Sequence, residues 1–192
     1  MPSDERQQKW QQRYSNGVAT EPAPCGVLSE NAFLLPRHGG ALDLACGWGG
    51  NALFLARHGL DTEGWDYAPA AIERLNMMAH AQELRLKGVL RDVEEFPPEP
   101  QSFDVITVSY FLDRAIVPNL IEALRPGGLI FYETFLRDAV SDEGPGNSAF
   151  RLADNELLQM FSGLRVISYT EHGSIGEVSA GVRNVARLVA AR

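Results

Sequence analysis

The stretch Ala41-Leu42-Asp43-Leu44-Ala45-Cys46-Gly47-Trp48-Gly49-Gly50 decides the fold. It is an apolar run that ends in a glycine-rich turn, and a second apolar segment starts at Asn51. The pattern predicts a buried strand, a tight turn and the N-terminus of a helix, which together form a nucleotide-binding corner of an α/β sheet. Glycine permits a positive φ there and lets a ligand approach the main chain.

Two classes of ligand compete for this corner. Residues Gly47 to Ala52 fit the loose G-x-G-x-x-G/A pattern of dinucleotide sites. Asp43 argues against a dinucleotide, because a carboxylate aimed at the turn repels a pyrophosphate and suits a cation. Between Ala41 and Ala56 the sequence has no Lys or Arg to offset phosphate charge. S-adenosylmethionine carries a sulfonium, an ammonium and no phosphate, so it fits this polarity.

The sequence resembles the class I S-adenosylmethionine-dependent methyltransferases, and within them the small bacterial proteins related to tellurite-resistance methyltransferases. The wider resemblance spans about Ala41 to Phe135 and rests on residues 43–50, Asp66, Asp92 and Arg125-Pro126-Gly127-Gly128. The narrower one rests on Trp10…Arg13-Tyr14, on Ala45-Cys46-Gly47 and on the short chain. The resemblance implies an enzyme whose cofactor is S-adenosyl-L-methionine and whose product is S-adenosyl-L-homocysteine.

Composition narrows the class of protein. The 192 residues predict one methyltransferase domain over 1–192, with 1–35 as an N-terminal helical lid or cap. The net charge of −8 does not favour binding to nucleic acid or to an anionic membrane, so a small-molecule partner is favoured. We found no signal-peptide pattern, membrane-spanning run, metal-binding cluster or disulfide framework. We expect a cytoplasmic monomer or weak homodimer without a metal.

The remaining apolar segments predict the rest of the sheet. Strands are expected at 60–67, 86–90, 103–108 and 129–135, and the runs 164–170 and 184–190 would close a hairpin. Helices are expected at 25–35, 51–58, 69–83, 115–124 and 154–161. This order predicts a Rossmann-like, doubly wound, mostly parallel seven-stranded sheet with an antiparallel C-terminal hairpin. The long loop 136–151 has no periodicity, and such loops are often functional lids.

Acidic residues after the predicted strands are candidate cofactor contacts. Asp66 ends the second predicted strand, where it can hydrogen-bond a ribose diol while Tyr67 lies against the adenosine; a helix cap is the alternative for Asp66. The resemblance implies that Asp92 meets the adenine amino group and that the Val93 N–H meets a ring nitrogen; a turn aspartate is the alternative. The expected cofactor-binding set is Asp43, Ala45, Gly47, Gly49, Asp66, Tyr67, Asp92, Val93, Ser109 and Arg13.

The N-terminal segment is a candidate lid. Trp10 and Tyr14 are four residues apart, which places both rings on one face of a helix. They either attach this helix to the domain or cover the ligand, with Arg13 free to meet a carboxylate. The resemblance implies that a segment of this kind covers the cofactor.

The second chemical site is expected after the fourth predicted strand, because open α/β sheets bind ligands at the carboxyl ends of their strands. The catalytic or acceptor-pocket candidates are Tyr110, Arg114, Arg151 and His172, and Glu133 and Arg183 could line the same pocket. An oxyanion such as tellurite or selenite, or a thiol, would want Arg or His donors; a small amine is a further candidate acceptor. Each Arg is otherwise a solvated or salt-bridged side chain, and His172 a surface-turn histidine.

Two other functions stay open from the sequence alone. One is a non-catalytic module that binds S-adenosylmethionine or S-adenosylhomocysteine. The other is an NAD-dependent oxidoreductase, which would need a Tyr-x-x-x-Lys pair where this chain has Tyr110 and Arg114. Methylation of amide, base-amino or cytosine carbon atoms is disfavoured, because no Asn-Pro-Pro-Tyr, Asp-Pro-Pro-Tyr or Pro-Cys motif is present. The sequence therefore predicts in-line methyl transfer to a small-molecule acceptor.

Overall fold

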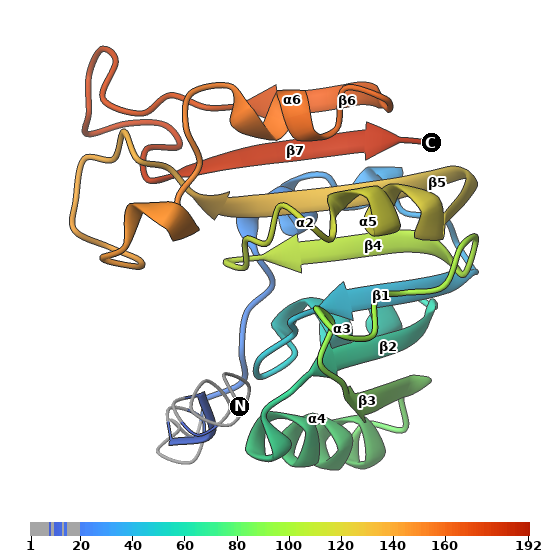
Figure 1. Ribbon diagram of the computed structural model, residues 1–192. Coiled ribbons are helices and arrows are strands. Elements are labelled where there is room, and N and C mark those ends of the chain that lie inside the picture. Colours follow the sequence, from blue (N-terminus) through green and yellow to red (C-terminus); the bar gives the residue numbers. More distant parts are fainter. Residues whose placement is uncertain (1–7, 9, 13, 15–19) are drawn as a thin grey trace.

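The computed structural model describes residues 8, 10–12, 14 and 20–192 of the chain. In this part a seven-stranded sheet runs in the order β3-β2-β1-β4-β5-β7-β6 (Figure 1). The strands are β1 (Gly40–Leu44), β2 (Asp61–Asp66), β3 (Leu86–Leu90), β4 (Phe103–Ser109), β5 (Leu124–Phe135), β6 (Arg165–Thr170) and β7 (Val185–Ala191). Strands β1 to β5 are parallel, whereas β7 is antiparallel to both β5 and β6. The predicted sheet, with its antiparallel C-terminal hairpin, is confirmed.

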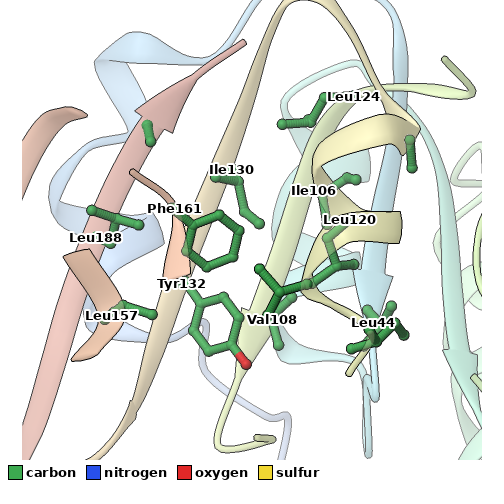
Figure 2. Close-up of a cluster of buried hydrophobic side chains, with 14 of the residues drawn as sticks. Leu44, Ile106, Val108, Leu120, Leu124, Ile130, Tyr132, Leu157, Phe161 and Leu188 are labelled. Atoms are coloured by element: carbon green, nitrogen blue, oxygen red, sulfur yellow. The ribbon is translucent and has the colours of Figure 1, made fainter. Parts of the chain in front are cut away.

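Helices cover both faces of this sheet. They are α2 (Gly26–Glu30), α3 (Gly50–Arg57), α4 (Pro69–Ala81), α5 (Val117–Ala123) and α6 (Glu156–Met160), with short 3-10 turns η1 (Ala32–Leu34) and η2 (Ser148–Phe150). Apolar residues of α5 and α6 pack with one face of the central strands, and Figure 2 shows Leu120, Leu157 and Phe161 in that cluster. Residues of α2, α3 and α4 pack in the clusters that contain Ala41 and Cys46. The chain is doubly wound, as predicted.

Strand β1 lies at the centre of the sheet, and its side chains alternate between the two layers. Leu42 and Leu44 join the cluster of α5 and α6, while Ala41 joins that of α2. All three are fully buried, because β1 pairs with β2 on one side and with β4 on the other. Asp43 shares the face of Ala41, so its carboxylate is directed at α3 rather than at solvent.

Two elements differ from the sequence prediction, and the order of the last two strands in the sheet was not predicted. The expected helix 25–35 is broken into α2 and η1, where the Asn31 amide donates to the carbonyl of Val27. Strand β5 starts at Leu124 rather than at 129, because Leu124 pairs with Phe103 before the register shifts. The last strand, β7, lies between β5 and β6, so only β6 forms the edge on that side.

The carboxyl ends of β1 and β4 share an unusual backbone feature. Ala45 and Tyr110 directly follow these strands, and both are non-glycine residues with positive φ, at 55° and 56°. Such conformations cost about 1–3 kcal/mol and cluster at functional sites. They mark the crevice where an α/β sheet of this type binds its ligands.

Over the part of the chain that the structure describes, no helix combines the length and the apolar character needed to cross a membrane.

Candidate active site

Asn51 connects the glycine corner to its surroundings. It is the second residue of α3, is 4% exposed, and its amide reaches three segments. Nδ2 donates to Asp43 Oδ1 over 3.2 Å and to Ser109 Oγ over 2.9 Å, while Oδ1 accepts from the N–H of Cys25 over 2.8 Å. One side chain therefore joins β1, β4 and the start of α2. The sequence prediction used Asn51 only as a helix start.

Asp43 lies under the N-terminus of α3. It is fully buried, and its second oxygen accepts from the N–H of Ala52 over 2.9 Å. Burial raises the pKa of Asp43 to about 7, although the hydrogen bonds from Asn51 and Ala52 lower it. The carboxylate thus faces the glycine turn and the helix start, as predicted from its charge, and it accepts hydrogen bonds from Asn51 and Ala52.

Asp66 holds the turn from the end of β2. Its Oδ2 accepts from the N–H of Gly47 over 2.9 Å, and its Oδ1 accepts from the N–H of Ala68 over 2.9 Å. Burial raises the pKa of Asp66, and these backbone donors lower it. A carboxylate has about four lone-pair sites, and because the backbone N–H of Tyr67 also acts on this group, about one site is left for a further donor. Half-buried Tyr67 follows directly.

Gly47 and Gly49 in the turn cannot be replaced by larger residues without strain. Gly47 has φ 52°, and a Cβ there would lie 2.8 Å from Oη of Tyr14. Gly49 has φ 79°, and a Cβ there would lie 2.3 Å from Leu75 Cδ1. Both residues therefore combine a left-handed backbone with close packing, which only glycine accommodates without strain.

The N-terminal segment reaches the same corner. The ring of Tyr14 stacks on Trp10 and meets Trp48 edge-on, with 5.8 Å between centroids in each pair. Gln11 Oε1 accepts from the N–H of Ala70 over 3.0 Å at the start of α4. The predicted pairing of Trp10 and Tyr14 on one face is present. Arg13, expected to meet a carboxylate, lies outside the described residues.

The other cofactor candidates occupy the neighbouring strand ends. Ser109 Oγ accepts the bond from Asn51 at the end of β4. Asp92 follows β3, and its Oδ1 accepts from the N–H of Glu94 in a turn, which was the alternative reading of this residue. Val93 is buried in the main core. The structure brings Asp43, Ala45, Gly47, Gly49, Asp66 and Ser109 to one corner, with Tyr67, Asp92 and Val93 beside it.

The corner suits an adenosine compound with positive charge and no phosphate. Two buried carboxylates, Asp43 and Asp66, lie beneath the turn. The buried indole Nε1 of Trp48 has no hydrogen-bond acceptor among the described residues, which leaves a donor for a ligand oxygen. The Arg74 guanidinium lies 4.9 Å over the Trp48 ring, a nearby cation that the sequence prediction did not foresee, and its Nη2 donates to the carbonyl of Thr20.

A cleft of about 470 Å³ opens at the ends of β4 and β5. It is lined by Glu30, Tyr110, Glu133, Phe135, Glu143, Gly181, Val182, Arg183, Asn184, Val185 and Arg187. Tyr110 follows Ser109 directly, so the cleft adjoins the glycine corner. Of the predicted acceptor residues, this cleft brings together Tyr110, Glu133 and Arg183.

This cleft contains charged side chains whose pairing was not predicted from the sequence. Arg187 of β7 lies opposite Glu133 of β5, with its Nε 2.7 Å from Oε2 of that carboxylate. The N–H is not aimed straight at Oε2, so the contact is an ion pair rather than a linear hydrogen bond. Nη1 of Arg187 also donates to both oxygens of Glu30. The sequence could have indicated this pair, because each of two apolar runs contains one charged residue: Glu133 in 129–135 and Arg187 in 184–190.

Arg114 and Arg151 hold the loop after β5 in place. Arg114 donates to both oxygens of Glu156 and to the carbonyls of Ala149 and Arg151. Arg151 donates to the carbonyls of Pro145, Leu136 and Glu143. Their N–H groups are used inside the protein and neither side chain lines the cleft, so we correct their assignment as acceptor-pocket donors. The salt-bridged alternative describes Arg114, which pairs with Glu156, whereas Arg151 donates to backbone carbonyls.

Arg183 and His172 belong to the loop between β6 and β7. Arg183 donates to the carbonyls of Gly173, Ile175, Glu177 and Ala180, so it closes this loop although its side chain also borders the cleft. His172 is exposed, and its Nδ1 accepts from the N–H of Val182. It lines a separate shallow hollow rather than the cleft, which corrects its place as a pocket residue.

Comparisons with known proteins show what this chain is similar to. Residues 41–128 match the family described as a methyltransferase domain. The chain is 29% identical over 152 residues to the probable S-adenosyl-L-methionine-dependent methyltransferase TehB of Haemophilus influenzae, which covers 77% of this chain and 52% of TehB. It is 29% identical over 122 residues to the ubiquinone biosynthesis O-methyltransferase of Coxiella burnetii, covering 61% of this chain and 51% of that protein. The chain spans about half the length of the curated relatives it matches.

The fold agrees with that result. The crystal structure of TehB from Haemophilus influenzae matches with a TM-score of 0.72 at 23% identity, over 95% of this chain and 67% of that chain. The matched domain, the TehB relative and the fold make this chain similar to S-adenosylmethionine-dependent methyltransferases.

Proposed function

We propose that this chain transfers the methyl group of S-adenosylmethionine to a small-molecule acceptor in the cleft at the ends of β4 and β5. The observation that carries the proposal is the hydrogen bond from Asn51 to Ser109. Asn51 belongs to the glycine corner, and Ser109 precedes Tyr110 of the cleft. A cofactor site and an acceptor site are therefore neighbours, as direct transfer between two bound molecules requires.

The corner offers a partner for each part of the cofactor. Asp66 would accept from a ribose hydroxyl beside the bonds that it already accepts from backbone N–H groups. Asp92 and the main chain of Val93 would meet the adenine, next to Tyr67. The Trp48 N–H would donate to a ligand oxygen. Asp43 would supply negative charge beneath the cationic end, which is the polarity that favours this cofactor over a dinucleotide.

The N-terminal segment, within 1–35 of one domain, would close this corner as a lid. Tyr14 packs against Gly47 and Trp48, and Gln11 is hydrogen-bonded to the start of α4. These contacts cross the surface of the glycine turn. Arg13, which lies outside the described residues, is the donor that the sequence prediction assigns to the ligand carboxylate.

Methyl transfer requires mainly that the reacting atoms are aligned. S-adenosylmethionine supplies a methyl group already activated by its sulfonium. The chain has to hold the attacking atom, the carbon and the sulfur in line and to exclude water, and such orientation can supply about 7–11 kcal/mol of barrier reduction. The rigid junction of β1, β4 and α3 at Asn51 provides a fixed frame for that alignment.

Of the predicted acceptors, thiols and small amines fit the cleft better than tellurite or selenite, and a hydroxyl compound is a further candidate. Arg114 and Arg151 are bound to carbonyl groups and to Glu156, so they are not available as oxyanion donors. A hydroxyl acceptor also agrees with the name of one relative, a ubiquinone biosynthesis O-methyltransferase. We expect the protein to act in the cytoplasm as a monomer or weak homodimer, in line with its two free, buried cysteines, Cys25 and Cys46.

Calorimetry with S-adenosylhomocysteine tests the cofactor site. Asp66→Ala should weaken binding at least about tenfold, near 1.4 kcal/mol for a lost ribose contact. Asp61→Ala is the matched control, because Asp61 begins the same strand and only pairs with exposed Arg85. Equal affinity of Asp66→Ala and wild type for S-adenosylhomocysteine would show that Asp66 does not bind the cofactor. Thermal stabilisation by NAD and none by S-adenosylhomocysteine would favour the oxidoreductase alternative.

A screen of acceptors tests catalysis. Wild-type protein with S-adenosylmethionine is offered tellurite, selenite, small thiols, phenols and amines, and release of S-adenosylhomocysteine is measured. Turnover with one class supports the enzyme. Tight cofactor binding without turnover of any class would favour the non-catalytic binding module.

A further inference from the structure

Tyr110 and Glu133 form a pair that methyl transfer, as described above, leaves unused. Oη of Tyr110 donates to Oε1 of Glu133 over 2.8 Å. Glu133 is 1% exposed, and its Oε2 accepts from the N–H of Val27 over 2.9 Å and faces Arg187. The pair therefore leads from a phenol on the cleft wall to a buried carboxylate.

We propose that Tyr110 and Glu133 form a proton relay for an acceptor whose attacking atom carries a proton, such as a hydroxyl, a thiol or a protonated amine. The inference rests on the proposed methyl transfer and names its substrate class. Tyr110 is the catalytic residue, because it meets the acceptor. Glu133 acts through Tyr110.

The backbone holds Tyr110 where an acceptor can reach it. Its φ of 56° turns the chain at the end of β4, and its N–H donates to the carbonyl of Glu133. The ring packs on Phe135 with 5.1 Å between centroids, yet the residue is 53% exposed. A strained, half-exposed tyrosine on the wall of a cleft is costly unless the position serves a function.

The atoms and electrons of the step balance without a further reactant. A bond forms between the acceptor heteroatom and the methyl carbon, and the carbon–sulfur bond breaks with its electron pair going to sulfur. The proton of the acceptor passes to Oη of Tyr110, while the Tyr110 proton passes to Oε1 of Glu133. The proton then returns through Tyr110 to water in the cleft.

The electrostatic surroundings suit a relay. Burial and the nearby charge of Glu133 raise the pKa of Tyr110, so the phenol stays protonated between turnovers and passes a proton on instead of storing a charge. The thiol of Cys25 also lies near the pair, and burial raises its pKa to about 12, so it stays neutral. Arg187 is the ion-pair partner of Glu133.

The charge of the cleft disfavours an anionic acceptor. Three carboxylates line it, those of Glu30, Glu133 and Glu143, against two guanidinium groups. Arg187 is paired with Glu133 and Glu30, and Arg183 donates to carbonyls of its own loop. A neutral or cationic acceptor avoids repulsion there, and such an acceptor has a proton to lose.

The test compares two thiols on Tyr110→Phe, which keeps the ring against Phe135 and removes only the hydroxyl. Benzyl mercaptan is largely protonated near neutral pH, whereas 4-nitrothiophenol is largely ionised. General-base catalysis contributes about 10²–10⁴-fold, so kcat with benzyl mercaptan should fall at least about 100-fold while KM changes little. With 4-nitrothiophenol, kcat should change less than about threefold, because that thiol needs no base.

Tyr169→Phe is the matched control. Tyr169 also donates to a glutamate, Glu171, but lies on edge strand β6 outside the cleft. It should leave the rates with both thiols unchanged. Affinity for S-adenosylhomocysteine, which Tyr110→Phe should retain within about threefold, shows that the variant is folded.

Three results would overturn the relay. The first is an equal loss with both thiols, which would give Tyr110 a structural role, and the second is no loss with either. The third is wild-type protein that binds S-adenosylhomocysteine but methylates neither thiol, or methylates only tellurite or selenite. Wild-type protein that does not bind S-adenosylhomocysteine would instead overturn the proposed function itself, so the two failures are distinguishable.

Discussion

Replacement of Asn51 by alanine should destabilise the fold more than a typical polar substitution. The change removes three hydrogen bonds at once. Two of the partners, the Cys25 N–H and Asp43 Oδ1, belong to buried residues, and each buried group without a partner costs about 1–3 kcal/mol. Alanine favours a helix over asparagine by about 0.5 kcal/mol, so the net loss is about 1.5–5.5 kcal/mol.

Urea unfolding measures this loss. The midpoint should fall while the slope stays constant, because the change acts on stability and not on the surface exposed on unfolding. For a chain of this size each kcal/mol lowers Tm by about 2–4 °C. The variant should also bind S-adenosylhomocysteine more weakly, because the glycine corner loses its link to β4.

Asn76→Ala is the matched control. Asn76 also lies on a helix, and its amide bonds both the N–H and the carbonyl of Gly88 in β3, but the residue is exposed. Gly88 is buried but lies in edge strand β3, so water can reach its N–H and carbonyl once the amide is removed, and the loss should stay below about 1 kcal/mol. The reasoning about Asn51 is refuted by a loss within about 0.5 kcal/mol of wild type, or by one no larger than that of Asn76→Ala.

Two further predictions concern charge. Burial raises the pKa of Asp43 to about 7, so between about pH 4 and that value the folded protein binds more protons than the unfolded chain. This group therefore lowers the free energy of unfolding as the pH rises through that window, and Asp43→Asn should flatten the fall in urea midpoints; an unchanged slope would contradict the burial argument. Arg114→Ala should make residues 137–155 easier to cleave by protease while affinity for S-adenosylhomocysteine stays within about twofold. Arg85→Ala, at an exposed position, is the control. A tenfold loss of affinity for S-adenosylhomocysteine in Arg114→Ala would show that Arg114 belongs to the binding site.

The sequence predicted the fold well because local patterns determine it. Apolar runs of strand length alternate with helical periodicity, and glycine turns separate them. The corner at Asp43, Gly47 and Gly49 was predicted for the same reason, since its parts are adjacent in the chain. Strand and helix ends moved by a few residues, because tertiary pairing sets them, as the early start of β5 at Leu124 shows.

The cleft was harder to predict, because its contacts join distant residues. Tyr110 meets Glu133 across 23 positions, and Glu30 meets Arg187 across 157. Nothing local distinguishes an arginine that binds a ligand from one that donates to carbonyl groups, so Arg114 and Arg151 were placed in the pocket wrongly. Asn51 was missed because its three partners come together only in the folded sheet.

The position of β7 has a consequence for the order of assembly. This strand comes after β6 along the chain but is inserted between β5 and β6 in the sheet. Until Val185–Ala191 have been synthesised, β6 has no docking surface and β5 presents a bare row of backbone donors and acceptors. An emerging polypeptide that stalls before Val185 should therefore be prone to edge-to-edge aggregation, however complete its glycine corner already is.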